Sequence, residues 1–169
     1  MNSDRLFLIG LPGSGKSSLG EKISAILQLP FFDLDQCIEK RESRSIPEIF
    51  TSSGENYFRQ VETEELERVI RENKKLVLSA GGGTACFNNN MTLMNNSGAT
   101  VYLDVPIEVL LDRLLSSGIQ RPMFKGLDQK SAFEKLSELK RIRLDFYQQA
   151  NLTISGNSIT PEEILKALR

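Results

Sequence analysis

The sequence of 169 residues contains no histidine and no tryptophan. Without histidine there can be no Ser-His-Asp triad, no Cys-His dyad and no zinc or iron site built on imidazole. A general base in an active site of this chain would therefore be a carboxylate, in place of the more usual histidine. Without tryptophan, the chain also has no indole on which a base or a sugar could stack.

Cysteines and long apolar runs are scarce as well. Cys37 and Cys86 are the only cysteines and no close spacing joins them, so we expect neither a disulfide framework nor a thiolate metal site. Two partly buried thiols are typical of a reducing compartment, and we expect a cytoplasmic protein. The apolar run from Leu6 to Ile9 is too short for a secretion signal. No run approaches the roughly 18 apolar residues of a membrane span, so we expect no membrane partner.

The overall charge has no excess of either sign. Lys and Arg number 21 and Asp and Glu number 22, giving a net charge of −1. Dedicated nucleic-acid binders usually carry a basic excess, so we expect no nucleic-acid partner. The charge is unevenly spread, since residues 33–72 carry eleven acids and six bases whereas residues 113–143 carry eight bases and three acids. The basic stretch is either a solvated helix face or a surface that receives an anionic ligand.

Short apolar runs alternate with segments of helical periodicity along the whole chain. The predicted strands are residues 5–9, 31–32, 76–79, 100–103 and 152–154. The predicted helices are residues 17–27, 35–42, 46–52, 55–72, 107–115, 129–147 and 161–168, and residues 88–90 begin another. This alternation predicts one α/β domain over residues 1–169, with a parallel sheet covered by helices on both faces. Ligands of such folds bind at the carboxyl ends of the strands.

The segment Gly10-Leu11-Pro12-Gly13-Ser14-Gly15-Lys16-Ser17 matches the complete phosphate-loop motif G-x-x-x-x-G-K-S/T, between a predicted strand and a predicted helix. Its glycines allow successive backbone N–H groups to face phosphate oxygens, and the helix N-terminus adds partial positive charge. Lys16 can reach the β- and γ-phosphates, and the Ser17 hydroxyl can ligate Mg²⁺. The motif predicts a nucleoside triphosphate site but does not distinguish a switch, a motor or a small-molecule kinase.

Carboxylates and an arginine follow the second predicted strand. We expect Asp33 and Asp35 on an extended segment with their carboxylates on opposite sides, so that one could face the metal and the other an acceptor hydroxyl. Farther along, Glu55, Arg59 and Glu62 share one face of a predicted helix. They form either a surface ion-pair cluster or a site for an anion, and we expect Glu62 to hold Arg59 in place.

Three more groups complete the set of candidates. The run Gly81-Gly82-Gly83 ends the third predicted strand, and it is either a flexible turn or a place where a ligand approaches the backbone closely. Arg121 precedes Pro122 in the loop before the long basic helix, and Arg143 lies on that helix four residues before Tyr147. An arginine fork matches the two oxygens of a carboxylate or phosphate.

Together these motifs resemble the shikimate kinase family, in the nucleoside-monophosphate-kinase branch of phosphate-loop proteins, from Gly10 to about Ala150. The segments that carry the resemblance are Gly10 to Ser18, Asp33-x-Asp35-x-x-Ile38-Glu39, Ser45-Ile46-x-Glu48-Ile49-Phe50, Gly54-Glu55-x-x-Phe58-Arg59-x-x-Glu62, Gly81 to Gly83, Arg121-Pro122 and Arg143-x-x-x-Tyr147. The resemblance implies a three-layer α/β/α fold with a five-stranded parallel sheet in the order 2-3-1-4-5. It also implies substrate-binding helices at about 33–62 and a lid at about 116–128.

The resemblance further implies transfer of a phosphoryl group from ATP to the 3-hydroxyl of shikimate, giving shikimate 3-phosphate and ADP on the route to chorismate and the aromatic amino acids. Asp35 would orient the hydroxyls and accept the proton, Arg59 and Arg143 would clamp the carboxylate, and the glycines at 81–83 would contact the ring hydroxyls, Gly82 through its backbone. Mg²⁺ is the implied cofactor, with Ser17 as a direct ligand and Asp33 and Ser79 in the outer shell. The residues implied to bind ATP are Gly13, Ser14, Gly15, Lys16, Ser17, Ser18, Arg113 and Arg121, and Lys16 and Arg121 are implied to be catalytic as well.

The chain departs from the family pattern at two places. The family commonly has glycine two residues before the Ser45-Ile46 pair, where this chain has Ser43, and we expect a local change in the turn. Met123-Phe124 stand where the family usually has two leucines, and we expect altered lid packing around Arg121. For the adenine pocket, Arg113 and the turn at residues 155–157 are candidates.

Two other hypotheses stay open beside a monomeric shikimate kinase that uses ATP. One keeps the kinase chemistry with another acceptor, such as gluconate or a nucleoside monophosphate. The other is a nucleotide-binding switch or structural pseudo-kinase, which would bind ATP without turnover.

Overall fold

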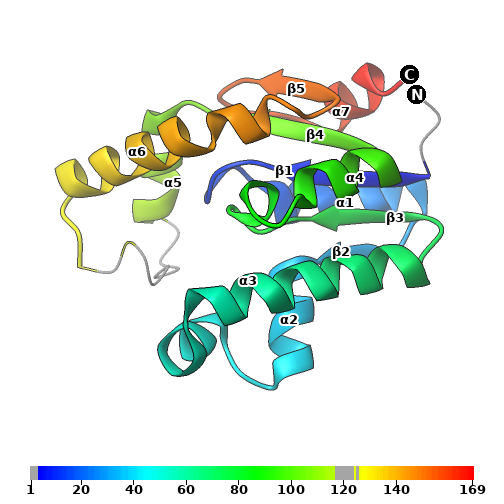
Figure 1. Cartoon of the computed structure of the whole chain (residues 1–169). Helices are drawn as coiled ribbons and strands as arrows, with labels where there is room; N and C mark the ends of the chain where they lie inside the picture. The colour runs from blue at the N-terminus through cyan, green and yellow to red at the C-terminus, as the bar shows by residue number, and fades with distance from the viewer. Residues whose placement is uncertain (1–3, 117–123, 125) are drawn as a thin grey trace.

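The computed structural model describes residues 4–116, 124 and 126–169, which fold around one parallel sheet (Figure 1). The strands are β1 (Arg5–Ile9), β2 (Phe31–Asp33), β3 (Leu76–Ser79), β4 (Ala99–Asp104) and β5 (Leu152–Ser155). The helices are α1 (Lys16–Leu27), α2 (Leu34–Glu42), α3 (Ile46–Glu72), α4 (Asn90–Ser97), α5 (Ile107–Ser116), α6 (Gln129–Tyr147) and α7 (Pro161–Ala167), with a 3₁₀ turn η1 (Thr84–Cys86). All neighbouring strands pair in parallel in the order β2-β3-β1-β4-β5. The predicted α/β fold and its strand order are confirmed.

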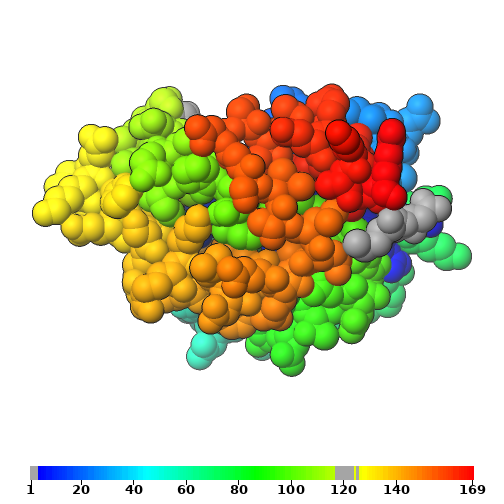
Figure 2. All heavy atoms as spheres, turned by 90° about the horizontal axis from the view of Figure 1, so that it is seen from above, coloured from blue at the N-terminus to red at the C-terminus, as the bar shows by residue number. Residues whose placement is uncertain are grey.

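The central strands form the core because they are apolar on both faces. Phe7, Leu8, Leu78 and Val101 are fully buried, as is usual for a parallel sheet covered on both sides. Helices α1 and α7 contact each other behind the sheet, and α4 lies in front of it beside α3 and η1 (Figure 1). Seen from above in Figure 2, α6, β5 and α7 form one closely packed surface. The three layers place every βα turn at one edge of the sheet.

Helix α3 joins two segments that the sequence predicts as separate helices. Gly54 lies inside it with φ 81° and ψ 173°, which is not a helical conformation. The chain therefore bends at Gly54, and the predicted halves at 46–52 and 55–72 persist on either side of the kink. Glu55 is therefore the first residue of the second half of α3.

The turn between α2 and α3 takes the shape that glycine favours, although this chain has serine there. Ser43 ends α2 with φ 52° and ψ 30°, in the left-handed region. Ser45 then begins α3 with a capping box, in which its hydroxyl accepts from the N–H of Glu48 and the Glu48 side chain accepts from the N–H of Ser45. The departure from the family pattern is thus a strained serine in an otherwise preserved turn.

Part of the predicted lid, residues 117–123 and 125, lies outside the described residues, and Arg121, Pro122 and Met123 are among them. The described ends of this connection are Ser116, where α5 ends, and Asp128, whose carboxylate caps α6. Among the helices of the described ranges, none combines the length and the apolar composition that a membrane crossing requires.

Candidate active site

The phosphate loop has the geometry that its motif predicts. It connects β1 to α1, and Gly13 and Gly15 have φ of 85° and 93°, where residues with a side chain would be strained. A Cβ on Gly10 would lie 2.9 Å from the carbonyl oxygen of Leu103. The Lys16 ammonium donates to the carbonyl oxygens of Gly10 and Leu11 at 3.0 and 3.1 Å, which holds it over the loop. The loop is therefore preformed.

Two serines of the loop differ in their surroundings. Ser14 is buried, and its hydroxyl has no hydrogen-bond partner in the described part of the chain. Such a hydroxyl normally has a partner, and a phosphate oxygen at the loop would supply one. Ser18 is exposed in the first turn of α1.

A carboxylate and two hydroxyls meet beside the loop. The Ser17 hydroxyl donates to Asp33 Oδ2 at 2.5 Å and lies 3.2 Å from the Ser79 hydroxyl, so β2 and β3 both contribute to this point. Hard oxygen donors of this kind suit Mg²⁺, which is usually completed by phosphate oxygens and water. Across the described residues there is no cluster of three His, Cys, Asp or Glu side chains that could hold a metal by itself. Ser17 and Asp33 thus fit a magnesium ion that arrives with a nucleotide.

The expectation of an extended segment at Asp33 and Asp35 is wrong. Helix α2 begins at Leu34, and Asp33 is its N-cap, whose Oδ1 accepts from the backbone N–H of Gln36 at 3.3 Å. In an extended strand, residues two apart would share a face. Because the chain turns into a helix instead, Asp33 accepts from the Ser17 hydroxyl whereas Asp35 lies beside Gly81. The two carboxylates do face different neighbours, but for a different reason.

The glycine run after β3 brings the other candidates together. A Cβ on Gly81 would lie 2.8 Å from Asp35 Oδ1, and one on Gly82 would lie 3.1 Å from Pro12 Cδ in the phosphate loop. One on Gly83 would lie 2.8 Å from both Nη1 and Nη2 of Arg59. The run is therefore a closely surrounded turn and not a flexible one, since no larger residue fits without displacing a neighbour.

Arg143 reaches the same turn from α6. Its Nη1 donates to the carbonyl oxygen of Gly82 at 3.0 Å, and the Tyr147 hydroxyl donates to the same oxygen. Tyr147 is buried and its ring stacks on Tyr102, with 4.9 Å between the ring centroids. Burial raises the pKa of the Tyr147 hydroxyl, so it stays protonated and donates. Tyr102 was not a sequence candidate, and no local pattern marks it.

Arg59 is held by carboxylates on either side. Glu62 Oε2 accepts from Nη1 at 2.8 Å, which confirms the expected role of Glu62, and Glu62 Oε1 accepts from the Thr84 hydroxyl at 2.6 Å. Glu55 Oε1 accepts from Nε and Nη2 at 3.2 and 3.1 Å. The ring of Phe87 lies 4.0 Å from Arg59 Cζ. Thr84 and Phe87 escaped the sequence prediction because only the fold brings this segment to α3.

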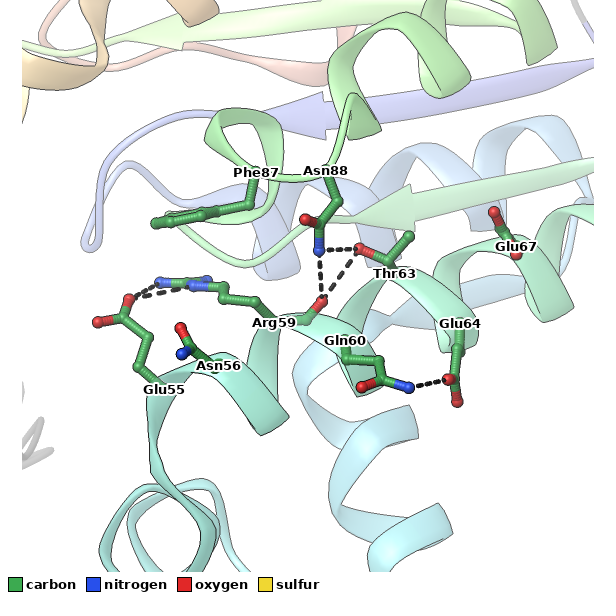
Figure 3. A pocket seen from close by; sticks show the side chains of 9 residues that line it. All are labelled: Glu55, Asn56, Arg59, Gln60, Thr63, Glu64, Glu67, Phe87 and Asn88. Atoms are coloured by element: carbon green, nitrogen blue, oxygen red, sulfur yellow. Dashed lines mark hydrogen bonds and ion pairs between the residues drawn. The ribbon is translucent and has the colours of Figure 1, made fainter.

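An open hollow of about 740 Å³ lies beside Arg59 along the exposed side of α3 (Figure 3). Glu55, Arg59 and Phe87 line one end of it, and Glu64 and Glu67 line the other. Asn88 closes its side, since its Nδ2 donates to the Arg59 carbonyl oxygen and to the Thr63 hydroxyl, each at 3.1 Å. The hollow is not at the phosphate loop, but it gives solvent access to Arg59.

Cys86 lies near the arginines at the end of η1. Burial raises the pKa of its thiol, although Arg143 and Arg59 act in the opposite direction. A protonated thiol is a poor nucleophile. Cys37 is also a free thiol with a pKa raised by burial, so neither cysteine has the character of a catalytic residue.

Arg113 connects the two regions that are candidates for the adenine pocket. Its Nη1 donates to the carbonyl oxygen of Gly13 at 3.2 Å, and its Nη2 donates to that of Asn157 at 2.7 Å. It therefore lies between the phosphate loop and the turn after β5. Arg121, the other candidate cation, lies outside the described residues.

Comparisons with known proteins agree with this geometry. The family model for shikimate kinase matches residues 12–169. A shikimate kinase of Azobacteroides pseudotrichonymphae is 38% identical over 165 residues, which are 97% of this chain and 96% of the relative. The crystal structure of shikimate kinase from Bacteroides thetaiotaomicron is similar with a TM-score of 0.91 and 36% identity, over 97% of this chain and 95% of that one.

Shikimate kinase from Acinetobacter baumannii, solved in complex with shikimate, is similar with a TM-score of 0.85 and 31% identity, over 97% of this chain and 89% of that one. A family model over nearly the whole chain and relatives of near-equal length leave no large segment unmatched. The chain belongs to the shikimate kinase family.

Proposed function

We propose that this kinase transfers the γ-phosphoryl group of ATP to the 3-hydroxyl of shikimate, giving shikimate 3-phosphate and ADP, on the route to chorismate and the aromatic amino acids. The observation that carries the proposal is the turn at Gly81–Gly83. It contacts the phosphate loop through Pro12, a carboxylate through Asp35, and two arginines through Gly82 and Gly83. The proposed base, the proposed carboxylate clamp and the phosphate loop would then surround one turn, as an anionic acceptor with hydroxyl groups requires.

Nucleotide binding rests on the preformed loop. Backbone N–H groups of Gly13, Ser14 and Gly15 face the phosphates, Lys16 leaves its two carbonyl partners for phosphate oxygens, and Ser18 contributes from the first turn of α1. When bound, Mg²⁺ neutralises charge that builds up on the phosphate oxygens as the phosphoryl group moves. Ser17 would hold it directly, with Asp33 and Ser79 in the outer shell. Arg113 borders the adenine, and Arg121 from the lid contacts the transferring group.

Asp35 is the proposed general base. The chain has no histidine, and two carboxylates lie beside Gly81, with Asp35 Oδ1 at 2.8 Å and Glu62 Oε1 at 3.1 Å from a Cβ there. Glu62 already accepts hydrogen bonds from Arg59 and Thr84, which leaves Asp35 as the better candidate. Arg59 and Arg143 clamp the carboxylate of shikimate, because their planar forks match two oxygens. The backbone of Gly82 contacts the ring hydroxyls. Because the residues of the proposed site belong to one chain, a monomer would suffice for catalysis, and we propose that the enzyme acts as a monomer in the cytoplasm.

The relative from Acinetobacter baumannii supports the choice of acceptor, since that protein was solved with shikimate bound. Gluconate also carries a carboxylate beside hydroxyl groups, so the two arginines suit it too, and it is an alternative acceptor that has to be tested. A nucleoside monophosphate is a second anionic acceptor with hydroxyl groups.

A coupled assay of ADP release tests the proposal. Purified protein with ATP and Mg²⁺ is given shikimate, gluconate or a nucleoside monophosphate in turn. The proposal expects ADP release that depends on shikimate and is abolished by Arg59→Ala with Arg143→Ala. Turnover with another acceptor alone, or ATP binding without turnover on any acceptor, would contradict it.

A further inference from the structure

Three neighbours among the described residues, Glu62, Phe87 and Gly83, block the approach to parts of the Arg59 guanidinium. Glu62 Oε2 accepts a hydrogen bond from Nη1 at 2.8 Å. Glu62 is 1% exposed, and its other oxygen accepts from the Thr84 hydroxyl. The ring of Phe87 covers one face, 4.0 Å from Cζ. The backbone of Gly83 lies across the end of the fork, because a Cβ there would be 2.8 Å from Nη1 and Nη2 and 3.1 Å from Cζ. A carboxylate therefore cannot reach Arg59 from these directions.

The remaining edge, formed by Nε and Nη2, is the side on which an arginine can bind a carboxylate through two parallel hydrogen bonds. In this structure Glu55 occupies it, with Oε1 at 3.2 and 3.1 Å from the two nitrogens. Figure 3 shows Glu55 reaching this edge from the start of the second half of α3, next to the hollow. Among the residues that the structure describes, Glu55 therefore already occupies the edge of Arg59 that is left open to an incoming carboxylate.

Glu55 and Glu62 differ in how firmly they are held. The Glu62 side chain is 1% exposed, whereas that of Glu55 is 55% exposed, and Arg59 is its one hydrogen-bonding partner in the described part of the chain. It follows the kink at Gly54, where a Cβ would meet nothing within 4 Å. Ion pairs of this exposed i,i+4 kind are weak. Glu62 is thus a permanent partner of Arg59 and Glu55 a releasable one.

We propose that Glu55 is an internal substitute for the substrate carboxylate, and that its displacement from Arg59 sets the specificity of the acceptor site. The inference rests on the proposed function, because it takes Arg59 as the clamp for the shikimate carboxylate. An attached carboxylate competes at an effective concentration in the millimolar range or above. A free carboxylate that touches Arg59 alone competes poorly with it. Shikimate also reaches Asp35 and Arg143, and these contacts let it displace Glu55.

Competition by Glu55 would make the site selective by weakening the binding of unwanted ligands. It lowers the affinity for every carboxylate by the same factor, and only an acceptor with further contacts remains well bound. Removing the Glu55 charge should therefore strengthen binding of shikimate and, by a similar factor, of simple monocarboxylates. A residue that merely positioned Arg59 would have the opposite effect, since its loss would weaken binding.

Calorimetric titration and inhibition kinetics test the inference on the full chain. In Glu55→Gln, the Kd for shikimate should fall about two- to fivefold, the range expected for loss of a weak but partly shielded ion pair. The inhibition constant of benzoate, a monocarboxylate without hydroxyls, should fall by a comparable factor against shikimate. Glu55→Ala, which leaves no amide to bond with Arg59, should shift both constants in the same direction.

Glu67→Gln is the matched control. Glu67 lies on the same helix, lines the same hollow and is exposed, but it has no hydrogen bond to Arg59. The substitution makes the same change in net charge, so it reports the long-range electrostatic effect alone. Its Kd for shikimate should stay within about 1.5-fold of the wild-type value, as for most surface changes.

The outcomes separate the inference from the proposed function. Wild-type protein that neither binds nor phosphorylates shikimate overturns both. If wild-type protein is active, a Kd that is unchanged or higher in Glu55→Gln and Glu55→Ala overturns the inference alone, and so does an equal decrease in Glu67→Gln. Tighter binding of both shikimate and benzoate in the Glu55 variants, without it in Glu67→Gln, is the expected result.

Discussion

Replacing Gly83 by alanine should damage shikimate binding while the fold survives. Gly83 has φ −100° and ψ −13°, a backbone conformation that alanine adopts without strain. The added Cβ would lie 2.8 Å from Nη1 and Nη2 of Arg59, and ordinary contact begins near 3.4 Å. The guanidinium would therefore have to move by about 0.6 Å, away from its bonds to Glu62 and Glu55.

The magnitude follows from which atoms move. They belong to the tip of a long side chain, so the free energy of unfolding should change by no more than about 0.5 kcal/mol. Catalytic and binding groups need placement within about 0.5 Å, and a hydrogen bond to a charged group contributes about 1.5–3 kcal/mol. A loss of that size corresponds to a decrease of about 10- to 100-fold in kcat/KM for shikimate, mainly through KM. The KM for ATP should not change, because the phosphate loop is untouched.

Steady-state kinetics of ADP release with varied shikimate measure this effect, and urea unfolding measures stability. A double-mutant cycle with Arg59→Ala tests the cause, because the effect of Gly83→Ala should disappear when the arginine is absent. An unchanged KM for shikimate in Gly83→Ala would refute the reasoning. So would an equally large loss in the Arg59→Ala background, since the alanine would then act on something other than Arg59.

Three further predictions concern the base, a strained turn and a partly buried ion pair. Asp35→Asn should lower kcat at least 100-fold with little change in the Kd for ATP, since proton acceptance contributes about 10²–10⁴-fold; kinetics with near-normal kcat would exclude the base role. Ser43→Gly should raise the free energy of unfolding by about 0.5–1 kcal/mol, as φ is 52° there, and an unstabilised variant in urea unfolding would show that the serine is unstrained. Burial would raise the pKa of Asp104, but hydrogen bonds, chiefly from Lys140 and Tyr102, outweigh it and lower that pKa. This stability is present above the ordinary pKa of about 3.9 and is lost as the pH falls through the lowered value. Lys140→Met should therefore cost about 1 kcal/mol at pH 7 and progressively less as the pH falls below the ordinary pKa; a cost in urea unfolding that does not change over this range would contradict the role of the pair.

Local features of the chain could be predicted because they depend on neighbours in sequence. The strands and helices predicted from the spacing of apolar residues end within about two residues of their observed ends. This spacing is informative because it reflects which faces of an element are buried. The phosphate loop could be predicted in full, because its glycines and its lysine act through one local turn. The order of the strands came from the family resemblance, as a periodicity contains no information about which strand pairs with which.

The segment after β2 shows why other predictions failed. Asp33-Leu34-Asp35 has no apolar alternation that separates a strand end from a helix start, and the helix begins at Leu34 because Asp33 caps it. The turn η1 has three residues and no periodicity, so it could not be predicted. The kink at Gly54 joins two helices whose separate existence the sequence did indicate.

The sequence by itself determined which side chains are available for chemistry: no imidazole, a nucleotide loop, arginines that could hold an anion, and carboxylates as the candidate bases. Only the tertiary structure decided which of these groups meet. Asp35, Arg59 and Arg143 converge on one turn because parallel strands end at the same edge of the sheet and α6 packs across that edge. The structure also decided that Glu62 is buried and Glu55 exposed, although both lie within one turn of Arg59. Burial depends on what packs against a residue, and those partners lie far away in the chain.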